Sequence, residues 1–294
     1  MGFAHQFYII HYYLSYLHYY FLPAFIGGYE DRGIKPDISS RAKKETIMAK
    51  EITMQSLLAA GAHFGHKTSK WNPKMSKYIY TSRNGVHIMH LEKTVAKLNE
   101  AAKALEEAAK EGKTILFVGT KNQAKDIIRK AAKEVGMPFV AEKWLGGTLT
   151  NYPVISKLTK KLKELEGKKA SDEWEFFTKK EKLVMEREMK KLETNVGGIR
   201  EMTKLPDMVF VIDVKNEQTA VREVRHLNIP IVAIVDSNSD PVGIAHVIPA
   251  NDDSTKGLQL IVEFLTEAIK RGTTAAAAPV SQEKPAEAPK TVTA

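Results

Sequence analysis

The sequence predicts an α/β domain with a parallel sheet, helices on both faces and an inserted antiparallel helical hairpin. Two observations support this prediction. Short continuous runs of apolar, β-branched residues alternate with helical stretches, which is typical of strands buried on both faces. Midway along the chain this alternation gives way to two segments whose apolar residues recur at spacings of three and four. A chain of 294 residues is long enough for one large domain or two smaller ones.

The predicted elements of the α/β domain follow one another from residue 91 onward. We expect a helix over 91–110, a strand over 115–119, and a helix over 122–135 that ends at Gly136, as a helix C-terminus often does. The same unit recurs further along the chain. The repeat comprises strands over 208–213 and 231–236, a helix over 217–227 between them, and a last helix over 254–270 that packs on the sheet.

The helical hairpin is predicted from two apolar stripes. The first helix carries Ile155, Leu158, Leu162 and Leu165, and the second carries Met185, Met189, Leu192, Val196 and Ile199. Residues 166–177 suit a turn between antiparallel helices, and Thr178 with Glu181 makes a capping box at the second start. We therefore divide the domain into a first part over 48–153, the hairpin over 154–202, and a second part over 203–272.

The stretch 62–84 indicates nucleic-acid binding. It mixes cations with rings, in the order His63, His66, Lys67, Lys70, Trp71, Lys74, Lys77, Tyr78, Tyr80 and Arg83. Cations at this density suit phosphates, and rings can stack on bases exposed in RNA loops. The alternative is a solvated basic surface. The turn formers Asn72-Pro73 and Asn84-Gly85 favour an irregular loop that is held in place, rather than the polar face of a helix.

Charge and composition favour a polyanionic partner. The formal net charge is +9 and the pI is about 9.3. No cysteine is present, which excludes a disulfide framework and a thiolate metal site. The first hairpin helix adds a second, weaker group of cations, for which a solvated surface is the simpler interpretation for any one residue. This group consists of Lys157, Lys160, Lys161, Lys163, Lys168 and Lys169.

The two ends differ from the rest of the chain. Residues 273–294 are rich in Ala, Pro, Lys and Glu and are predicted to be a disordered tail. At the other end, the apolar run 7–26 has the length of a membrane span and a positive flank, so a membrane anchor is one hypothesis. Another hypothesis is that residues 1–47 are a leader read in frame. Lys44-Glu45 can be encoded by a purine-rich ribosome-binding sequence, and Met48 then opens an ordinary start. We favour the second hypothesis.

An enzyme or nucleotide-binding protein is the competing class. Gly119-Thr120-Lys121 follows the first parallel strand, where α/β folds place ligands, but no glycine-rich phosphate motif accompanies it. Asp213, Asp236 and Asp240 at or beyond strand ends suit a metal or a base, although they suit caps and turns as well. His63 and His66 are a possible metal pair, but no cysteine and no second close His pair completes the set. We therefore expect no metal, no cofactor and no catalytic residue.

Many spaced motifs, in sequence order, resemble the bacterial small-subunit ribosomal protein S-two family. The similarity covers about residues 48–272, with nothing similar in 1–47. Two departures are Ala250, where the family usually has glycine, and Val242, where an acid is common. The matching motifs are Ala62-His63-Phe64-Gly65-His66, Trp71 to Met75, Arg83 to Ile88, Leu91-Glu92-Lys93-Thr94, Phe117 to Lys121, Trp144 to Asn151, Leu205-Pro206-Asp207, Asp236 to Pro241 and Ile248 to Asp253.

The resemblance implies a flavodoxin-like fold and a non-catalytic role on the small ribosomal subunit, in the cytoplasm and away from membranes. Its implied partners are small-subunit ribosomal RNA and other small-subunit proteins, including the large messenger-binding protein that it helps to dock. It thereby implies support of translation initiation. The candidate RNA contacts are Lys67, Lys70, Trp71, Lys74, Lys77 and Arg83, followed by Lys157, Lys160 and Lys161.

Overall fold

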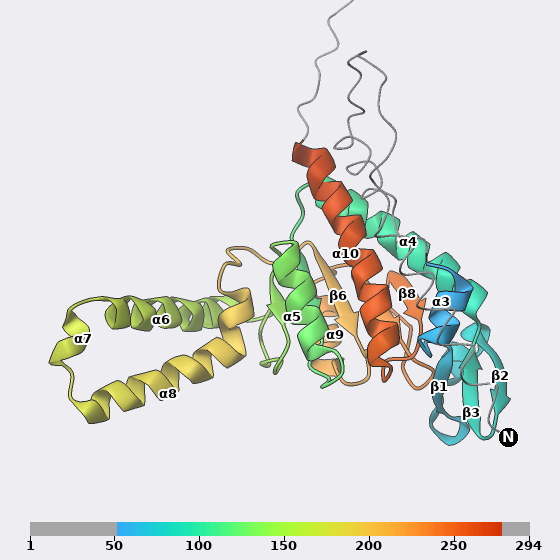
Figure 1. Ribbon diagram of the computed structural model, residues 1–294, viewed down its shortest axis with the longest axis horizontal. Coiled ribbons are helices and arrows are strands. Elements are labelled where there is room, and N and C mark those ends of the chain that lie inside the picture. The colour runs from blue at the N-terminus through green and yellow to red at the C-terminus, as the bar shows by residue number, and fades with distance from the viewer. Residues whose placement is uncertain (1–51, 278–294) are drawn as a thin grey trace, which may run out of the picture. The chain divides into compact units, whose positions relative to one another are not determined.

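The computed structural model describes residues 52–277, and a parallel five-stranded sheet lies at the centre of this part of the chain (Figure 1). Its strand order is β5-β4-β6-β7-β8, which reads 2-1-3-4-5 when the strands are counted along the chain. That order is the flavodoxin-like arrangement of doubly wound sheets. The strands are β4 (Ile115–Val118), β5 (Phe139–Val140), β6 (Met208–Ile212), β7 (Ile231–Val235) and β8 (His246–Pro249).

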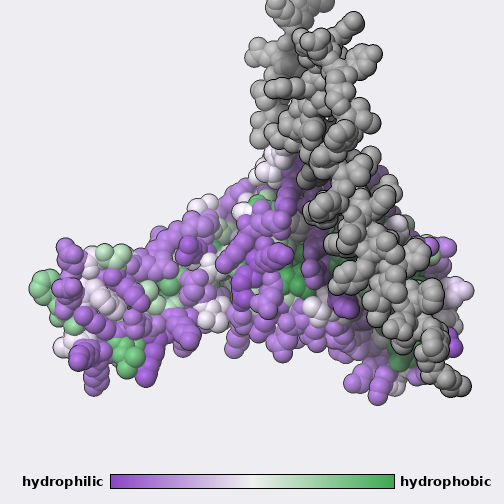
Figure 2. All heavy atoms as spheres, in the orientation of Figure 1, coloured by the Kyte–Doolittle hydropathy of each residue, from purple (hydrophilic) through white to green (hydrophobic). Residues whose placement is uncertain are grey.

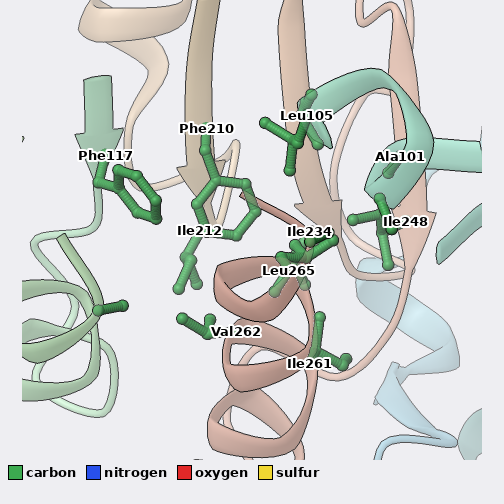
Figure 3. Close-up of a cluster of buried hydrophobic side chains, with 14 of the residues drawn as sticks. Ala101, Leu105, Phe117, Phe210, Ile212, Ile234, Ile248, Ile261, Val262 and Leu265 are labelled. Atoms are coloured by element: carbon green, nitrogen blue, oxygen red, sulfur yellow. The ribbon is translucent and has the colours of Figure 1, made fainter. Parts of the chain in front are cut away.

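Alternate residues of each strand enter two separate hydrophobic cores. Phe117 and Phe210 are register partners on neighbouring strands, and their rings pack edge to face with centroids 5.5 Å apart. They belong to the first core, shown in Figure 3 with side chains from α4 and α10. Leu116 and Val209, one position away on the same strands, belong to the second core. Both faces of the sheet are therefore covered, which explains why its strands read as continuous apolar runs.

Three long helices cover the first face. They are α4 (Leu91–Lys110), α5 (Lys125–Glu134) and α10 (Thr255–Ala277), and α10 packs along α4. The helix α10 continues to Ala277, beyond the predicted start of the tail at 273. The hydroxyls of Thr273 and Thr274 donate to the carbonyls of Ile269 and Lys270, as threonines inside a helix can.

The second face is covered by α9 (Gln218–His226) and by the segment between β5 and β6. That segment forms α6 (Tyr152–Ala170), α7 (Glu173–Phe176), α8 (Lys179–Val196) and the short 3-10 helix η3 (Gly197–Ile199). Both halves of the expected capping box are present at the start of α8, between Thr178 and Glu181. Lys169 of α6 pairs with Glu186 of α8 at 2.9 Å, which joins the two helices across their facing sides.

A second, smaller sheet lies N-terminal to α4. It has the order β1-β3-β2, and its neighbouring strands are antiparallel. The stretch 62–84, expected to be an irregular loop, instead contributes two of these strands and two 3-10 helices. In chain order, the elements before α4 are α3 (Met54–Ala59), β1 (Phe64–Lys67), η1 (Thr68–Lys70), η2 (Pro73–Tyr78), β2 (Ile79–Arg83) and β3 (Val86–Met89).

Two predictions fall outside the described residues: the leader or anchor over 1–47, and the tail from 278 onward. Among the helices of residues 52–277, none combines the length and the apolar character that crossing a membrane requires.

Candidate nucleic-acid interface

The basic segment 62–84 is fixed to the domain by buried side chains. Met75 and Tyr78 of η2 lie in the second core, with 0% and 7% of their surfaces exposed. The backbone N–H of Asn72 donates to the carbonyl of Ser237 at 2.8 Å, and the N–H of His66 donates to the Ser237 hydroxyl at 2.8 Å. The segment is therefore a preorganised surface, so binding a partner does not require it to be ordered first.

The six predicted RNA contacts of this segment are all exposed. Lys67 ends β1, Lys70 and Trp71 lie in or after η1, and η2 carries Lys74 and Lys77. Arg83 ends β2, beside the type of Asn-Gly turn that was expected, in which both Asn84 and Gly85 have positive φ angles of 52° and 73°. The structure thus gathers the six residues on one small sheet and its adjoining turns.

These cations differ in how far acidic neighbours compensate them. The Nζ of Lys74 lies 2.8 Å from the carboxylate of Asp240, and this bond holds the pKa of Asp240 below its usual value. The Nζ of Lys77 lies 4.9 Å from the centroid of the Tyr78 ring. Among residues 52–277, no carboxylate forms an ion pair with Lys67, Lys70, Lys77 or Arg83. Within residues 52–277, only Lys74 of the five cations is therefore offset by a carboxylate, and the charge of the other four is available to a partner.

The rings of the segment are partly open to solvent. The Trp71 side chain is 38% exposed and packs on His87, with ring centroids 5.2 Å apart. Both ring nitrogens of His87 are buried without a hydrogen-bond partner within the described structure. Tyr80 is 72% exposed and meets His90 edge to face, with centroids 5.6 Å apart. Exposed rings between uncompensated cations are the combination that single-stranded RNA needs.

The three lysines predicted on the hairpin belong to a different part of the domain. Lys157, Lys160 and Lys161 are exposed on α6, which packs on α7, α8 and η3 and not on the small sheet. Lys161 forms an ion pair with Glu188 of α8. Figure 2 shows that mainly hydrophilic residues cover the visible face of α6 and α8. The structure therefore does not join these lysines to the basic segment in one site.

The carboxyl end of the large sheet, where an enzyme would bind a ligand, is filled by the chain's own charged groups. The sheet order reverses between β4 and β6, and the residues after these strands line that switch point. There the carboxylate of Glu217 accepts hydrogen bonds from the Thr120 N–H at 2.8 Å and its hydroxyl at 2.6 Å. A carboxylate therefore occupies the donors that a phosphate group would need, which counts against nucleotide binding.

Lys121 is the centre of a partly buried charge cluster at the same edge. Its Nζ lies 2.6 Å from a carboxylate oxygen of Asp252, 2.6 Å from one of Asp253 and 3.4 Å from one of Asp213. Burial lowers the Lys121 pKa, but hydrogen bonds to the two neighbouring aspartates outweigh that effect and raise it. Lys121, at the position where an enzyme would bind a substrate phosphate, is thus held by the chain's own aspartates.

His66 joins this cluster, a grouping that the sequence analysis missed. Its Nδ1 lies 3.0 Å from an Asp236 carboxylate oxygen, and the hydrogen bond to Asp236 raises the pKa of His66 despite its burial. His66, Asp252 and Asp253 each offer one ligand atom within 4.8 Å of the others, so they have the donor types for a metal ion. The spacing in the sequence suggests only the pair of His66 with His63, because nothing local links His66 to residues about 190 positions away.

The fold and this surface define a class: a flavodoxin-like α/β protein whose exposed, anchored segment presents cations and rings. A family model described as ribosomal protein S2 matches residues 57–272. A protein of Flavobacterium johnsoniae named small ribosomal subunit protein uS2 is 46% identical over 242 residues, which cover 82% of this chain and 95% of that protein. The chain therefore belongs to the ribosomal protein S2 family, which is structural and not enzymatic.

Proposed function

We propose that this protein is a structural constituent of the small ribosomal subunit and that its basic segment binds small-subunit ribosomal RNA. The observation that carries the proposal is the set of exposed cations and rings on the small sheet, anchored by buried Met75 and Tyr78, in a chain of the ribosomal protein S2 family. Lysines and Arg83 there neutralise phosphates, while Trp71 lies where a base can stack.

We also propose that the segment α6 to α8 is an antiparallel coiled-coil hairpin that contacts neighbouring proteins of the small subunit. Leu162 and Leu165 of α6 are buried, with 1% and 7% exposed, whereas all six lysines of α6 are exposed. Lys157 and Lys160 belong to that exposed side. The partners include the large messenger-binding ribosomal protein, so the chain supports translation initiation on cytoplasmic ribosomes.

Salt-dependent binding of the full chain to small-subunit ribosomal RNA tests the RNA-binding role. Replacement of Lys70, Lys74 and Lys77 by alanine should weaken binding and make the plot of log affinity against log salt less steep, by about 0.7 to 0.9 per lost phosphate contact. Because Asp240 already pairs with Lys74, the single change Lys74→Ala should alter the slope least of the three.

A control variant removes the same number of charges elsewhere. Lys103, Lys110 and Lys130 are exposed on α4 and α5, outside the basic segment. Their replacement by alanine should leave the slope as in the unchanged chain. If the segment variant keeps the original slope, or if both variants flatten it equally, the basic segment is not the RNA-binding site.

A further inference from the structure

Tyr80 is the extra residue of a β-bulge. Strands β2 and β3 pair with Ile79 opposite Met89 and then Thr81 opposite Ile88, so β2 advances by two residues where β3 advances by one. Tyr80 has no partner across the ladder. Bulges bend a strand locally and re-aim the side chain at the bulge, and they are common at sheet edges beside functional sites.

The bulge presents the Tyr80 ring to solvent. Its side chain is 72% exposed, whereas Tyr78, two residues earlier, is only 7% exposed and anchors the segment. The ring of His90 meets that of Tyr80 at an interplanar angle of 85°, and the backbone N–H of His90 donates to the carbonyl of Tyr78 at 2.9 Å. An edge-to-face contact covers at most one face of the tyrosine. The ring is therefore supported from one side and has a free face.

Cations flank this ring along the chain. Lys77 precedes it by three residues, Arg83 ends the same strand, and the Nζ of Lys93 donates to the carbonyl of Lys77 at 2.5 Å. The nearby acid is Glu92, whose carboxylate lies 4.0 Å from the His90 imidazole. The cations Lys77, Arg83 and Lys93 favour a polyanion over a neutral or basic partner, and the exposed ring among them favours nucleic acid over an acidic protein surface. Strand β2 is an edge strand of the small sheet, and within residues 52–277 no further strand pairs with its outer edge.

We propose that Tyr80 is a stacking residue that takes one unpaired base of the bound RNA, from a loop or a bulge rather than from a duplex. Bases in a duplex already stack on their neighbours, and only an unpaired base can stack on a side chain. The flanking cations then meet the phosphates on either side of that base. The inference rests on the proposed RNA binding and adds to it a residue and a class of RNA feature.

Two substitutions separate stacking from the other properties of this side chain. Tyr80→Ala removes the ring, and it should weaken binding of the full chain to small-subunit ribosomal RNA by about 5- to 150-fold at fixed salt. The slope of log affinity against log salt should stay unchanged, because no phosphate contact is lost. Tyr80→Phe keeps the ring and should bind as the unchanged chain does. Thermal melting of both variants verifies that they fold.

Ultraviolet cross-linking gives a direct readout. The unchanged chain, cross-linked to the RNA and digested, should carry a nucleotide adduct on Tyr80, and the attached nucleotide should lie in a loop or bulge. Equal affinity of Tyr80→Ala and the unchanged chain would refute the proposal. So would a Tyr80→Phe variant as weak as Tyr80→Ala, since the hydroxyl would then be the binding group. If the lysine variants still flatten the salt slope in either case, RNA binding survives and only the role of Tyr80 fails.

Discussion

The carboxylate of Glu223 on α9 accepts a hydrogen bond from the indole Nε1 of Trp144 at 3.0 Å, on the same face of the sheet as α6. The same carboxylate accepts bonds from the backbone N–H groups of Gly147 at 2.8 Å, Leu149 at 3.0 Å and Thr150 at 3.2 Å. One buried side chain thus satisfies the polar groups of the turn that leads into α6. The Trp-Leu-Gly-Gly motif, Trp144 to Gly147, therefore serves this junction through core packing of the tryptophan and a tight turn.

Replacing Glu223 by glutamine should destabilise the fold by about 3 kcal/mol. The amide nitrogen of glutamine only donates, so it cannot accept the bonds that the second carboxylate oxygen accepts from Leu149 and Thr150, and buried N–H groups would be left without partners. Urea unfolding of both proteins measures the difference. The exposed Glu164→Gln on α6 is the control and should change the free energy of unfolding by less than about 0.5 kcal/mol.

The effect of Glu223 should also depend on acidity. Burial raises its pKa, but hydrogen bonds from Trp144 and from the turn outweigh burial and lower the pKa below 4.5. The stabilisation is therefore present above about pH 4.5 and is lost as the pH falls through the lower folded-state pKa. The difference in unfolding free energy between the original chain and Glu223→Gln should therefore shrink in that acid range. A difference that stays constant down to pH 3 would contradict this account.

The charge cluster around Lys121 predicts that the stability of the fold depends on pH in the opposite direction, falling as the pH rises toward 7. Burial, followed by the charges of Asp213 and Asp236, raises the pKa of Asp252 from 3.8 to about 7. The folded chain therefore keeps a proton that the unfolded chain releases, and stability falls as the pH rises from about 4 to 7. The raised pKa of His66 adds a loss of the same sign, but only above about pH 6.5.

The variant Asp252→Asn tests this assignment. Between pH 5 and 6.5, the unfolding free energy of the original chain relative to the variant should decrease by up to about 1.4 kcal/mol per pH unit. Urea unfolding at several pH values measures the slope. The exposed Asp172, before α7, offers a control, because Asp172→Asn should leave the slope as it is. Parallel pH curves for the chain and Asp252→Asn would show that this carboxyl does not titrate in that window.

Two glycines of the segment from α6 to η3 should respond to alanine in opposite directions. At Gly198 of η3, an added Cβ would meet the carbonyl oxygen of Phe139 and come within 2.8 Å of its ring, so Gly198→Ala should cost about 1 to 3 kcal/mol. At Gly167 inside α6 nothing lies within 4 Å of an added Cβ. Gly167→Ala should therefore stabilise the chain by about 0.5 to 1 kcal/mol. Melting temperatures that move in the same direction for both variants would contradict this packing.

Sequence patterns predicted the elements that burial makes distinctive. Strands β4, β6 and β7 were found because helices cover both their faces, so only apolar residues fit there. The two residues of β5 are too few for any pattern, and His246 and Pro249 interrupt the apolar run of β8. The strands β1 to β3 were missed because much of the small sheet is open to solvent, so its residues show no apolar alternation.

The cations and rings of the basic segment could be grouped from the sequence because they lie close together along the chain. The cluster at the sheet edge could not be grouped in this way, because His66, Lys121 and Asp252 come from segments far apart in the chain and meet only through the strand order. Neither the pairing of Lys74 with Asp240 nor the exposure of Tyr80 has a signal in the sequence, since each depends on a register or a contact that only the folded chain defines.

The strand order also determines when the domain can fold during its synthesis. β4 and β6 are neighbours in the sheet, and the N–H of Thr114 bonds to the carboxylate of Asp207, 93 residues later. As the chain emerges from the ribosome, β4 can pair only with β5, and its other edge stays open until all of α6 to α8 has been made. Such non-local pairing slows folding and leaves a strand edge exposed to aggregation. A nascent chain released before residue 208 would therefore be a substrate for chaperones, whereas one extended past 249 has all five strands to close the sheet.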